Sequence, residues 1–290
     1  MNEKPRQYAT AAAFRVALET RLKAISTAEG ADLQRLRRQV SFDRLLARFF
    51  AERNAPWLLK GGYAMELRMR AARTTKDIDI SLPAGAVAEF GGEVLKRLQD
   101  SARADLADFF EFAIAAPQMD LKAAPQGGAR YPVVASLAGR MFTKFHLDVG
   151  MGDAVIPPTE LIEGRDWLGF AGIASPKFLA ISKEQQFAEK LHAYTLPRPE
   201  SPNSRVKDLV DMVLLARMGT MDKTVLKQAI ETTFGVRGTH SLPDSLPEPP
   251  DFWSAPFLAL TKECHIDVTL DDALKAISAY VISDAENHRL

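Results

Sequence analysis

Two aspartates separated by one residue are the first candidates for chemistry in this chain. Asp77 and Asp79 lie in residues 77–82, where polar and apolar side chains alternate strictly. Alternation predicts a β-strand, which points successive side chains to opposite faces and sets both carboxylates on one face, roughly 7 Å apart. Carboxylates this close repel each other unless a cation lies between them, and Mg²⁺ binds a few carboxylates together with phosphate oxygens. The pair is a candidate metal site, although an Asp-x-Asp pattern alone favours a solvated edge strand with two aspartates.

A glycine pair precedes the aspartates by about fifteen residues. Gly61 and Gly62 follow Lys60, which ends a short apolar run, and the helical pattern of residues 63–70 comes next. A strand, two glycines and a helix form a layout in which backbone N–H groups and the helix N-terminus can contact a phosphate. The alternative is an ordinary β–α turn. The basic residues that follow usually mark a solvated helix face; they are Arg68, Arg70, Arg73 and Lys76.

A second strand can bring a third carboxylate to the pair. In residues 141–149 every second residue from Phe145 onward is apolar, which places His146 and Asp148 on the opposite face. Pairing of this strand with residues 77–82 would set Asp148 beside the two aspartates. Taken alone, Asp148 is better explained as a lone aspartate at a strand end before Gly150.

The C-terminal half adds a lysine and two further aspartates. Lys190 lies in a helical segment beside an apolar stripe, and Asp208 and Asp211 are three residues apart, hence on one side of a helix. Lys207 could pair with Asp211 at a spacing of four residues. Spacing alone favours surface ion pairs for these groups.

The elements that must position these residues follow from periodicity and caps. Ser182 and Gln185 form a capping box, in which Ser182 caps the helix and Gln185 reaches back. Helices are predicted over residues 11–28, 31–50, 63–70, 86–106, 182–194, 206–218, 222–234 and 270–284. Strands are predicted over residues 77–82, 109–115, 131–137 and 141–149, the last two joined by a short hairpin connection at residues 138–140. The result is an α+β half followed by a helical half.

Composition excludes several classes of protein. The chain has 290 residues, 47% of them hydrophobic, with 37 Lys and Arg against 37 Asp and Glu, so its formal net charge is zero. A polybasic nucleic-acid binder is thereby disfavoured, although a local basic groove remains open. One cysteine, no secretory signal pattern and no apolar run of about 20 residues favour a cytoplasmic protein without a membrane span.

Four motifs in this order resemble the nucleotidyltransferase toxins of the AbiEii/AbiGii type. They are residues 59–68 (LKGGYAMELR), 73–79 (RTTKDID), 189–193 (EKLHA) and 205–211 (RVKDLVD). The resemblance covers about residues 45–217 and implies an α+β fold. In that fold a polymerase-beta-like nucleotidyltransferase core, a mixed sheet flanked by helices, is followed by a C-terminal helical domain. The corresponding boundaries are an N-terminal helical segment at 1–40, the core at 41–172 and the helical domain at 173–290.

The resemblance also implies a role for each matching residue. The implied metal ligands are Asp77, Asp79 and Asp148; the implied nucleotide-binding residues are Lys60, Gly61, Gly62, Lys190 and Asp208; the implied catalytic residues are Asp77, Asp79, Asp148, Lys190 and Asp211. One departure concerns the residue after the glycine pair, which is commonly Ser or Thr in polymerase-like relatives and is Tyr63 here. Backbone N–H groups, or Thr74 and Thr75, would then supply the phosphate contact.

The implied function is transfer of a nucleoside monophosphate from an NTP to an RNA acceptor, the tRNA 3′ end, with a block of translation. The implied cofactor is a pair of Mg²⁺ ions, with Mn²⁺ as a substitute, and the implied partner is a cognate antitoxin. A basic groove for RNA could be lined by Arg21, Lys23, Arg35, Arg37 and Arg38. The alternatives are a nucleotidyltransferase that modifies a protein or a small molecule, and a catalytically degenerate binding module.

Overall fold

The structure, a computed structural model, describes residues 7–69, 72–86, 93–121 and 124–286. The chain divides into two compact units. Unit 1 comprises Met1–Leu67, Thr74–Gly152 and Leu161–Ala180, and unit 2 comprises Arg68–Arg73, Asp153–Glu160 and Ile181–Leu290. Among the described residues, no helix is long and apolar enough to cross a lipid bilayer.

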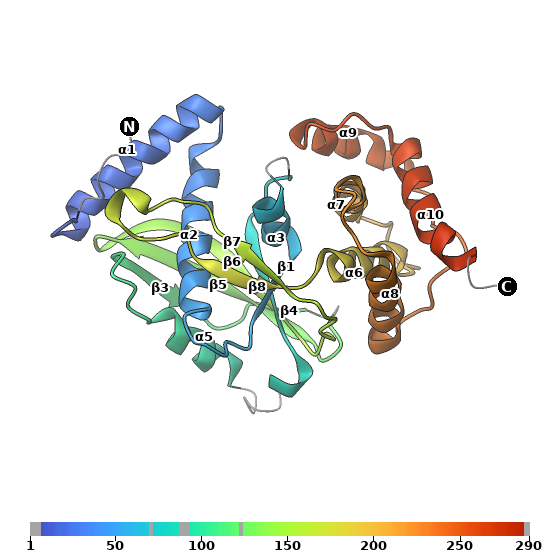
Figure 1. The fold of residues 1–290 in the computed structure, drawn as a ribbon, viewed down its shortest axis with the longest axis horizontal. Helices are drawn as coiled ribbons and strands as arrows, with labels where there is room; N and C mark the ends of the chain where they lie inside the picture. Colours follow the sequence, from blue (N-terminus) through green and yellow to red (C-terminus); the bar gives the residue numbers. More distant parts are fainter. Residues whose placement is uncertain (1–6, 70–71, 87–92, 122–123, 287–290) are drawn as a thin grey trace. The chain divides into compact units, whose positions relative to one another are not determined.

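An eight-stranded mixed sheet forms the centre of unit 1 (Figure 1), counted over the part of the chain that the structure describes. The strands are β1 (Leu58–Lys60), β2 (Asp77–Leu82), β3 (Phe110–Ile114), β4 (Met119–Asp120), β5 (Gly128–Leu137), β6 (Arg140–Met151), β7 (Glu160–Glu163) and β8 (Lys177–Ala180). Their order is β3-β5-β6-β2-β1-β8-β7, with β4 paired to β5. The predicted α+β fold with a mixed sheet is confirmed.

The central strands have different directions. β2 is antiparallel to β1 and parallel to β6, and β5 and β6 form a long antiparallel hairpin. This arrangement places β2 in the interior of the sheet, with a neighbour on either side. An edge-strand interpretation of Asp77 and Asp79 is therefore wrong.

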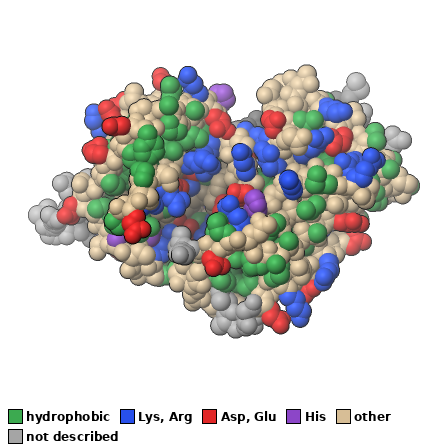
Figure 2. Space-filling model, turned by 180° about the vertical axis from the view of Figure 1, so that it is seen from behind, with side chains coloured by type: hydrophobic (Ala, Val, Ile, Leu, Met, Phe, Trp, Pro, Cys, Tyr) green, Lys and Arg blue, Asp and Glu red, His purple; other side chains and the backbone are tan. Residues whose placement is uncertain are grey.

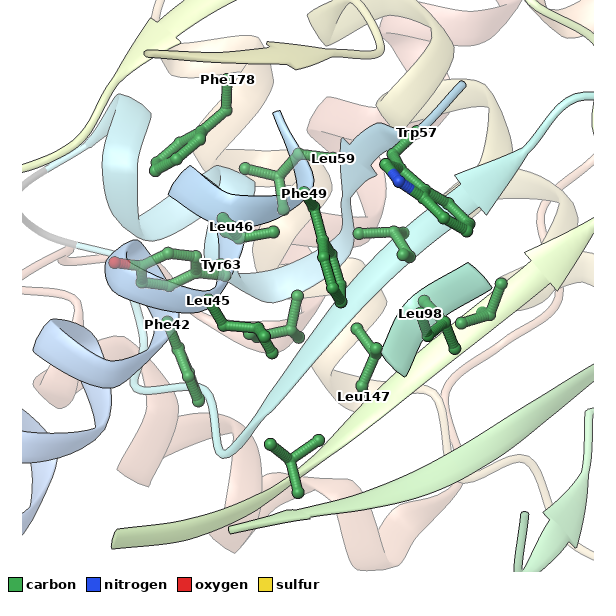
Figure 3. Close-up of a cluster of buried hydrophobic side chains, with 14 of the residues drawn as sticks. Phe42, Leu45, Leu46, Phe49, Trp57, Leu59, Tyr63, Leu98, Leu147 and Phe178 are labelled. Carbon is green, nitrogen blue, oxygen red and sulfur yellow. The ribbon is translucent and has the colours of Figure 1, made fainter. Parts of the chain in front are cut away.

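One face of the sheet forms the main hydrophobic core. The alternating apolar residues Ile78 and Ile80 of β2 and Leu147 of β6 are fully buried on this face. Figure 3 shows this core, in which α2 (Leu33–Phe49) contributes side chains such as Phe42 and Phe49, and α5 (Val94–Ala102) contributes Leu98. Because strand side chains alternate, the residues between them occupy the other face. A second core cluster joins α1 (Ala11–Glu29) to the rest of unit 1 through Phe14, Leu18 and Leu22.

Several predicted boundaries in unit 1 are wrong. α3 (Gly61–Arg68) begins at the first glycine of the pair rather than at residue 63. The helix predicted over residues 86–106 ends at Ala102, and residues 87–92 lie outside the described chain. β3 begins at Phe110 because Phe109 has a φ of 59°, which a strand cannot contain. The sequence interpretation missed β4, β7 and β8, which are two to four residues long and too short for a periodic signal.

Unit 2 is built mainly from helices. They are α6 (Lys183–Thr195), α7 (Val206–Arg217), α8 (Lys223–Arg237), α9 (Ser254–Glu263) and α10 (Leu270–Glu286). α6 packs against α7 and α8, and α7 packs against α9 and α10. Ser182 caps α6 by accepting a hydrogen bond from the Gln185 N–H at 3.1 Å. The predicted return contact is wrong: the Gln185 side chain instead donates to the Ala154 carbonyl and accepts from the Ile156 N–H.

Candidate active site

Asp77 and Asp79 lie on the face of the sheet opposite the core, and β6 adds polar residues beside them. The parallel register sets Asp79 opposite Asp148 and Asp77 opposite His146. The Nδ1 atom of His146 lies 3.2 Å from a carboxylate oxygen of Asp77. Neighbouring strands are about 4.8 Å apart, so three carboxylates gather on a small patch of this face. We call Asp77, Asp79 and Asp148 the carboxylate cluster.

A guanidinium group lies within the carboxylate cluster. Arg130 of β5 donates two hydrogen bonds of 2.7 Å to the two oxygens of Asp148, and its Nη2 atom lies 3.4 Å from Asp77. Hydrogen bonding to Asp148 raises the pKa of Arg130 above its usual range. The Arg130 and Asp77 side chains are each 29% exposed, whereas that of Asp148 is 11% exposed. Asp148 is therefore the more firmly engaged of the two carboxylates that contact Arg130, and Asp77 remains open to solvent.

The glycine pair begins α3 directly beside Asp79. Gly61 has a φ of +66°, a backbone conformation that favours glycine, and Lys60 pairs with Asp79 across β1 and β2. A side chain at position 61 would overlap the Asp79 carboxylate. Absence of a side chain thus keeps the helix N-terminus, with its partial positive charge, in contact with a carboxylate of the cluster.

Tyr63 does not supply a hydroxyl for phosphate. Its ring is buried in the core, and its Oη donates to the Asp43 carboxylate at 2.5 Å. Asp43 is fully buried and also accepts from the Arg165 N–H at 3.1 Å. Burial raises the pKa of Asp43 to about 7, partly offset by these hydrogen bonds. The hydroxyl of Thr75 is also engaged locally, with the Asp77 carbonyl at 3.3 Å.

The sequence-predicted residues of unit 2 form a buried charge network. The Nζ atom of Lys190 lies 2.6 Å from Asp211 and 3.4 Å from Asp208. Arg73 donates to both oxygens of Asp211, at 3.0 and 2.8 Å. Asp211 is completely buried, so the prediction of a surface ion pair with Lys207 is wrong for it. Together Lys190, Arg73, Asp208 and Asp211 form the network that we call the lysine network.

The lysine network fixes the charge of its members. Burial alone would raise the pKa of Asp211, but Lys190 and Arg73 hold it below its usual range. Burial alone would lower the pKa of Lys190, but Asp211 and Asp208 raise it above its usual range. Lys190 therefore stays protonated although it is almost completely buried.

The basic stretch before the aspartates is not a solvated helix face where the structure describes it. Arg73 is buried in the lysine network, and the side chain of Arg68 is 5% exposed and pairs with Glu160 at 2.9 Å. Lys76 is exposed but lies outside a helix, and Arg70 lies outside the described residues. The sequence-predicted residues thus form two groups, the carboxylate cluster with the glycine pair in unit 1 and the lysine network in unit 2.

Comparison with protein families decides the classification. The family model described as the nucleotidyl transferase AbiEii toxin of a type IV toxin–antitoxin system matches residues 44–278. The chain belongs to the AbiEii nucleotidyltransferase toxin family. It is therefore a nucleotidyltransferase, as the sequence predicted.

One solved structure agrees with this classification at the level of the fold. The nucleotidyltransferase toxin MenT4 from Mycobacterium tuberculosis H37Rv is 16% identical, with a TM-score of 0.54 over 93% of this chain and 99% of that chain. JHP933 from Helicobacter pylori is 13% identical, with a TM-score of 0.41 over 86% of this chain and 97% of that chain. No curated protein matches the sequence.

The donor set of this AbiEii-family chain fits a hard divalent cation that also binds phosphate. Within the described residues, no group of three or more His, Cys, Asp or Glu side chains is arranged to hold a metal ion. Both oxygens of Asp148 accept from Arg130, so Asp77 and Asp79 are the better candidates for metal ligands. Mg²⁺ typically uses one or two carboxylates and completes its shell with water and phosphate oxygens, so two aspartates suffice.

Two residues that matter here were missed by the sequence interpretation. Arg130 directly precedes the predicted strand 131–137, and only the exact register of the hairpin shows that it faces Asp148. Arg73 was assigned to a solvated face, yet it lies in one of the motifs that carry the family resemblance, which was the available signal.

Proposed function

We propose that this AbiEii-family chain transfers a nucleoside monophosphate from an NTP to a hydroxyl of an RNA acceptor, the tRNA 3′ end. The observation that carries the proposal is the placement of Asp77 and Asp79 on the sheet face opposite the core, with the glycine pair against Asp79. This places the candidate metal ligands and a candidate phosphate-binding helix N-terminus next to each other.

Asp77 and Asp79 would hold Mg²⁺, with Mn²⁺ as a substitute, and Asp148 is the third candidate ligand. When bound, the ion would neutralise phosphate charge and lower the pKa of the acceptor hydroxyl. The resemblance suggested two ions. Family membership supports a divalent metal in general terms, and the carboxylate cluster supports an oxygen-binding one.

The chain's own residues would position and neutralise the substrate. The N–H groups at Gly61 and Gly62 would contact phosphate oxygens, and Lys60 would add a positive charge opposite Asp79. In the transfer, the acceptor hydroxyl gives up its proton to solvent and its oxygen forms a bond to the α-phosphorus. The bond between the α-phosphorus and the oxygen that bridges to the β-phosphorus breaks, and pyrophosphate leaves. Lys190, held protonated by Asp211 and Asp208, is the candidate for neutralising the leaving phosphates.

Membership of a toxin family supports an acceptor whose modification stops growth. Addition of nucleotides to the tRNA 3′ end would do so by blocking translation. A cognate antitoxin and a cytoplasmic location belong to the same proposal.

The candidate basic groove is weakened as an RNA site, because several of its charges are already engaged. Arg35 pairs with Glu66, Arg37 pairs with Glu19, and the Arg21 guanidinium lies over the Phe170 ring. Figure 2 shows charges of both signs interspersed on the face it presents, in keeping with a net charge of zero.

A transfer assay tests the proposal. The protein would be mixed with Mg²⁺, total tRNA, total cell protein and each α-labelled NTP in turn. Asp79→Asn would be the test variant, and Asp120→Asn, an exposed carboxylate on β4 of the same sheet, the matched control. Label in tRNA that disappears only with Asp79→Asn supports the proposal. Label in protein instead contradicts the RNA acceptor, and equal transfer by Asp79→Asn contradicts the assigned site.

A further inference from the structure

Arg130 places a fixed positive charge where the proposed function needs a divalent cation. It neutralises Asp148 through two hydrogen bonds of 2.7 Å and reaches Asp77 at 3.4 Å. Arginine cannot lose its proton in a protein, so the charge persists at every working pH. A free divalent ion approaching Asp77 and Asp79 therefore meets electrostatic repulsion from Arg130.

The charge balance changes when a nucleotide is present. A triphosphate brings several negative charges and oxygen ligands, which both complete the shell of a metal ion and offset the repulsion from Arg130. The Arg130 guanidinium repels a free ion, but it is attracted to phosphate oxygens that lie beside it. Metal binding is then no longer opposed.

We propose that Arg130 is an internal counter-cation that makes divalent-metal binding at Asp77 and Asp79 depend on bound nucleotide. The inference rests on the proposed function and deepens it, because it assigns to Arg130 the control of metal binding at the proposed site. Arg130 acts through the carboxylate cluster, so it is a positioning residue.

Metal binding can be measured without turnover. Mn²⁺ would be titrated into the full chain and followed by electron paramagnetic resonance, first alone and then with an NTP analogue that carries a methylene bridge between the α- and β-phosphates. Arg130→Gln removes the charge and should bind Mn²⁺ alone about tenfold more tightly than wild type, since a unit charge a few ångströms away is worth at least that factor. With the analogue present, the difference should shrink. Arg130→Lys keeps the charge and should remain close to wild type.

Two further variants separate this role from a structural one. Asp148→Asn removes a carboxylate and leaves Arg130 to Asp77, so Mn²⁺ binding should weaken, whereas Arg130→Gln should strengthen it. A merely structural ion pair would move both variants in the same direction. Arg140→Gln removes an exposed charge at the other end of β6 and serves as the matched control. If Arg130→Gln does not fold, Arg130→Lys decides, because lysine keeps the charge but cannot form both hydrogen bonds to Asp148. Mn²⁺ affinity close to wild type supports the charge role, and a clear loss of affinity supports a structural role.

The outcomes distinguish the two proposals. The role of Arg130 is overturned if Arg130→Gln binds Mn²⁺ within twofold of the wild-type affinity while both proteins bind Mn²⁺ in the presence of the analogue. That result leaves the proposed function intact. No Mn²⁺ binding by wild type even with the analogue overturns the metal-dependent function as well.

Discussion

The Asp79 carboxylate fills the space that a side chain at Gly61 would need. Two elements meet at this point, because Lys60 at the end of β1 pairs with Asp79 in β2 and α3 begins one residue later. Position 61 therefore requires glycine for two reasons, the nearby Asp79 carboxylate and its own positive φ.

Gly61→Ala should abolish transfer. The substitution adds strain at a φ of +66° and forces the Asp79 carboxylate to move. Gly139→Ala is a matched control, because Gly139 has a φ of +67° but no atom lies within 4 Å of the position that a Cβ would take. Both variants should lose about 1 kcal/mol of stability from backbone strain, measured by urea unfolding. Only Gly61→Ala should lose activity in the transfer assay, and normal kcat/KM in that variant would contradict the assignment.

Asp211→Asn should destabilise the protein strongly. It leaves the buried cations Lys190 and Arg73 without their shared counter-charge, and breaking a buried pair in this way costs about 3–5 kcal/mol. Asp208→Asn is the comparison, because its side chain is 15% exposed and lies 3.4 Å from Lys190. It should cost about 1 kcal/mol or less. Urea unfolding followed by circular dichroism measures both, and equal costs would show that Asp211 is not the centre of the network.

Much of the fold could be predicted because short stretches of sequence carry its signals, namely hydrophobic alternation and helix caps. The alternation in residues 77–82 reports burial of Ile78 and Ile80 on one face, and the same holds for Leu147 in β6. Ser182 was recognisable as a cap since its contact with Gln185 is only three residues away. The return contact of Gln185 failed because tertiary partners, Ala154 and Ile156, compete for its side chain.

The position of Arg130 shows why the rest of the site could not be predicted. The hairpin begins with Leu137 opposite Arg140, and that register continued without change would place Ala129 opposite Asp148. An irregularity between Ala135 and Ser136 shifts the pairing by one residue, so that Arg130 faces Asp148 instead. A one-residue shift moves a side chain to the other face of a sheet. No local sequence pattern predicts this irregularity, so the sequence could not place Arg130 beside Asp148.

Magnesium alone should leave the melting temperature unchanged. Arg130 already offsets charge in the carboxylate cluster, so a free ion should bind Asp77 and Asp79 too weakly to stabilise the folded state. Mg²⁺ together with the methylene-bridged NTP analogue should raise the melting temperature, because a ligand at 100 times its Kd stabilises the folded state by about 2.7 kcal/mol. Differential scanning fluorimetry with and without EDTA measures this. A rise with Mg²⁺ alone would contradict the expectation.

Asp43 should make stability fall as pH rises toward neutrality. Burial raises the pKa of Asp43 in the folded chain to about 7 from an ordinary value of 3.8. Between these values the folded state binds a proton that the unfolded state does not, so the free energy of unfolding decreases with increasing pH. The loss is complete above about pH 7 and amounts to at most roughly 4 kcal/mol, at 1.36 kcal/mol for each unit of pKa.

The Asp43→Asn variant isolates this effect from other titrating groups. It removes the ionisable carboxyl but keeps an oxygen that can accept a hydrogen bond from the Tyr63 hydroxyl. In the wild type Asp43 accepts this hydrogen bond at 2.5 Å. The variant loses the acceptor for the Arg165 N–H, so its stability at low pH should be lower than that of wild type. Urea unfolding at intervals from pH 5 to 8 should show a steeper decline for wild type than for Asp43→Asn. Parallel curves would mean that the buried carboxyl does not take up a proton in this range.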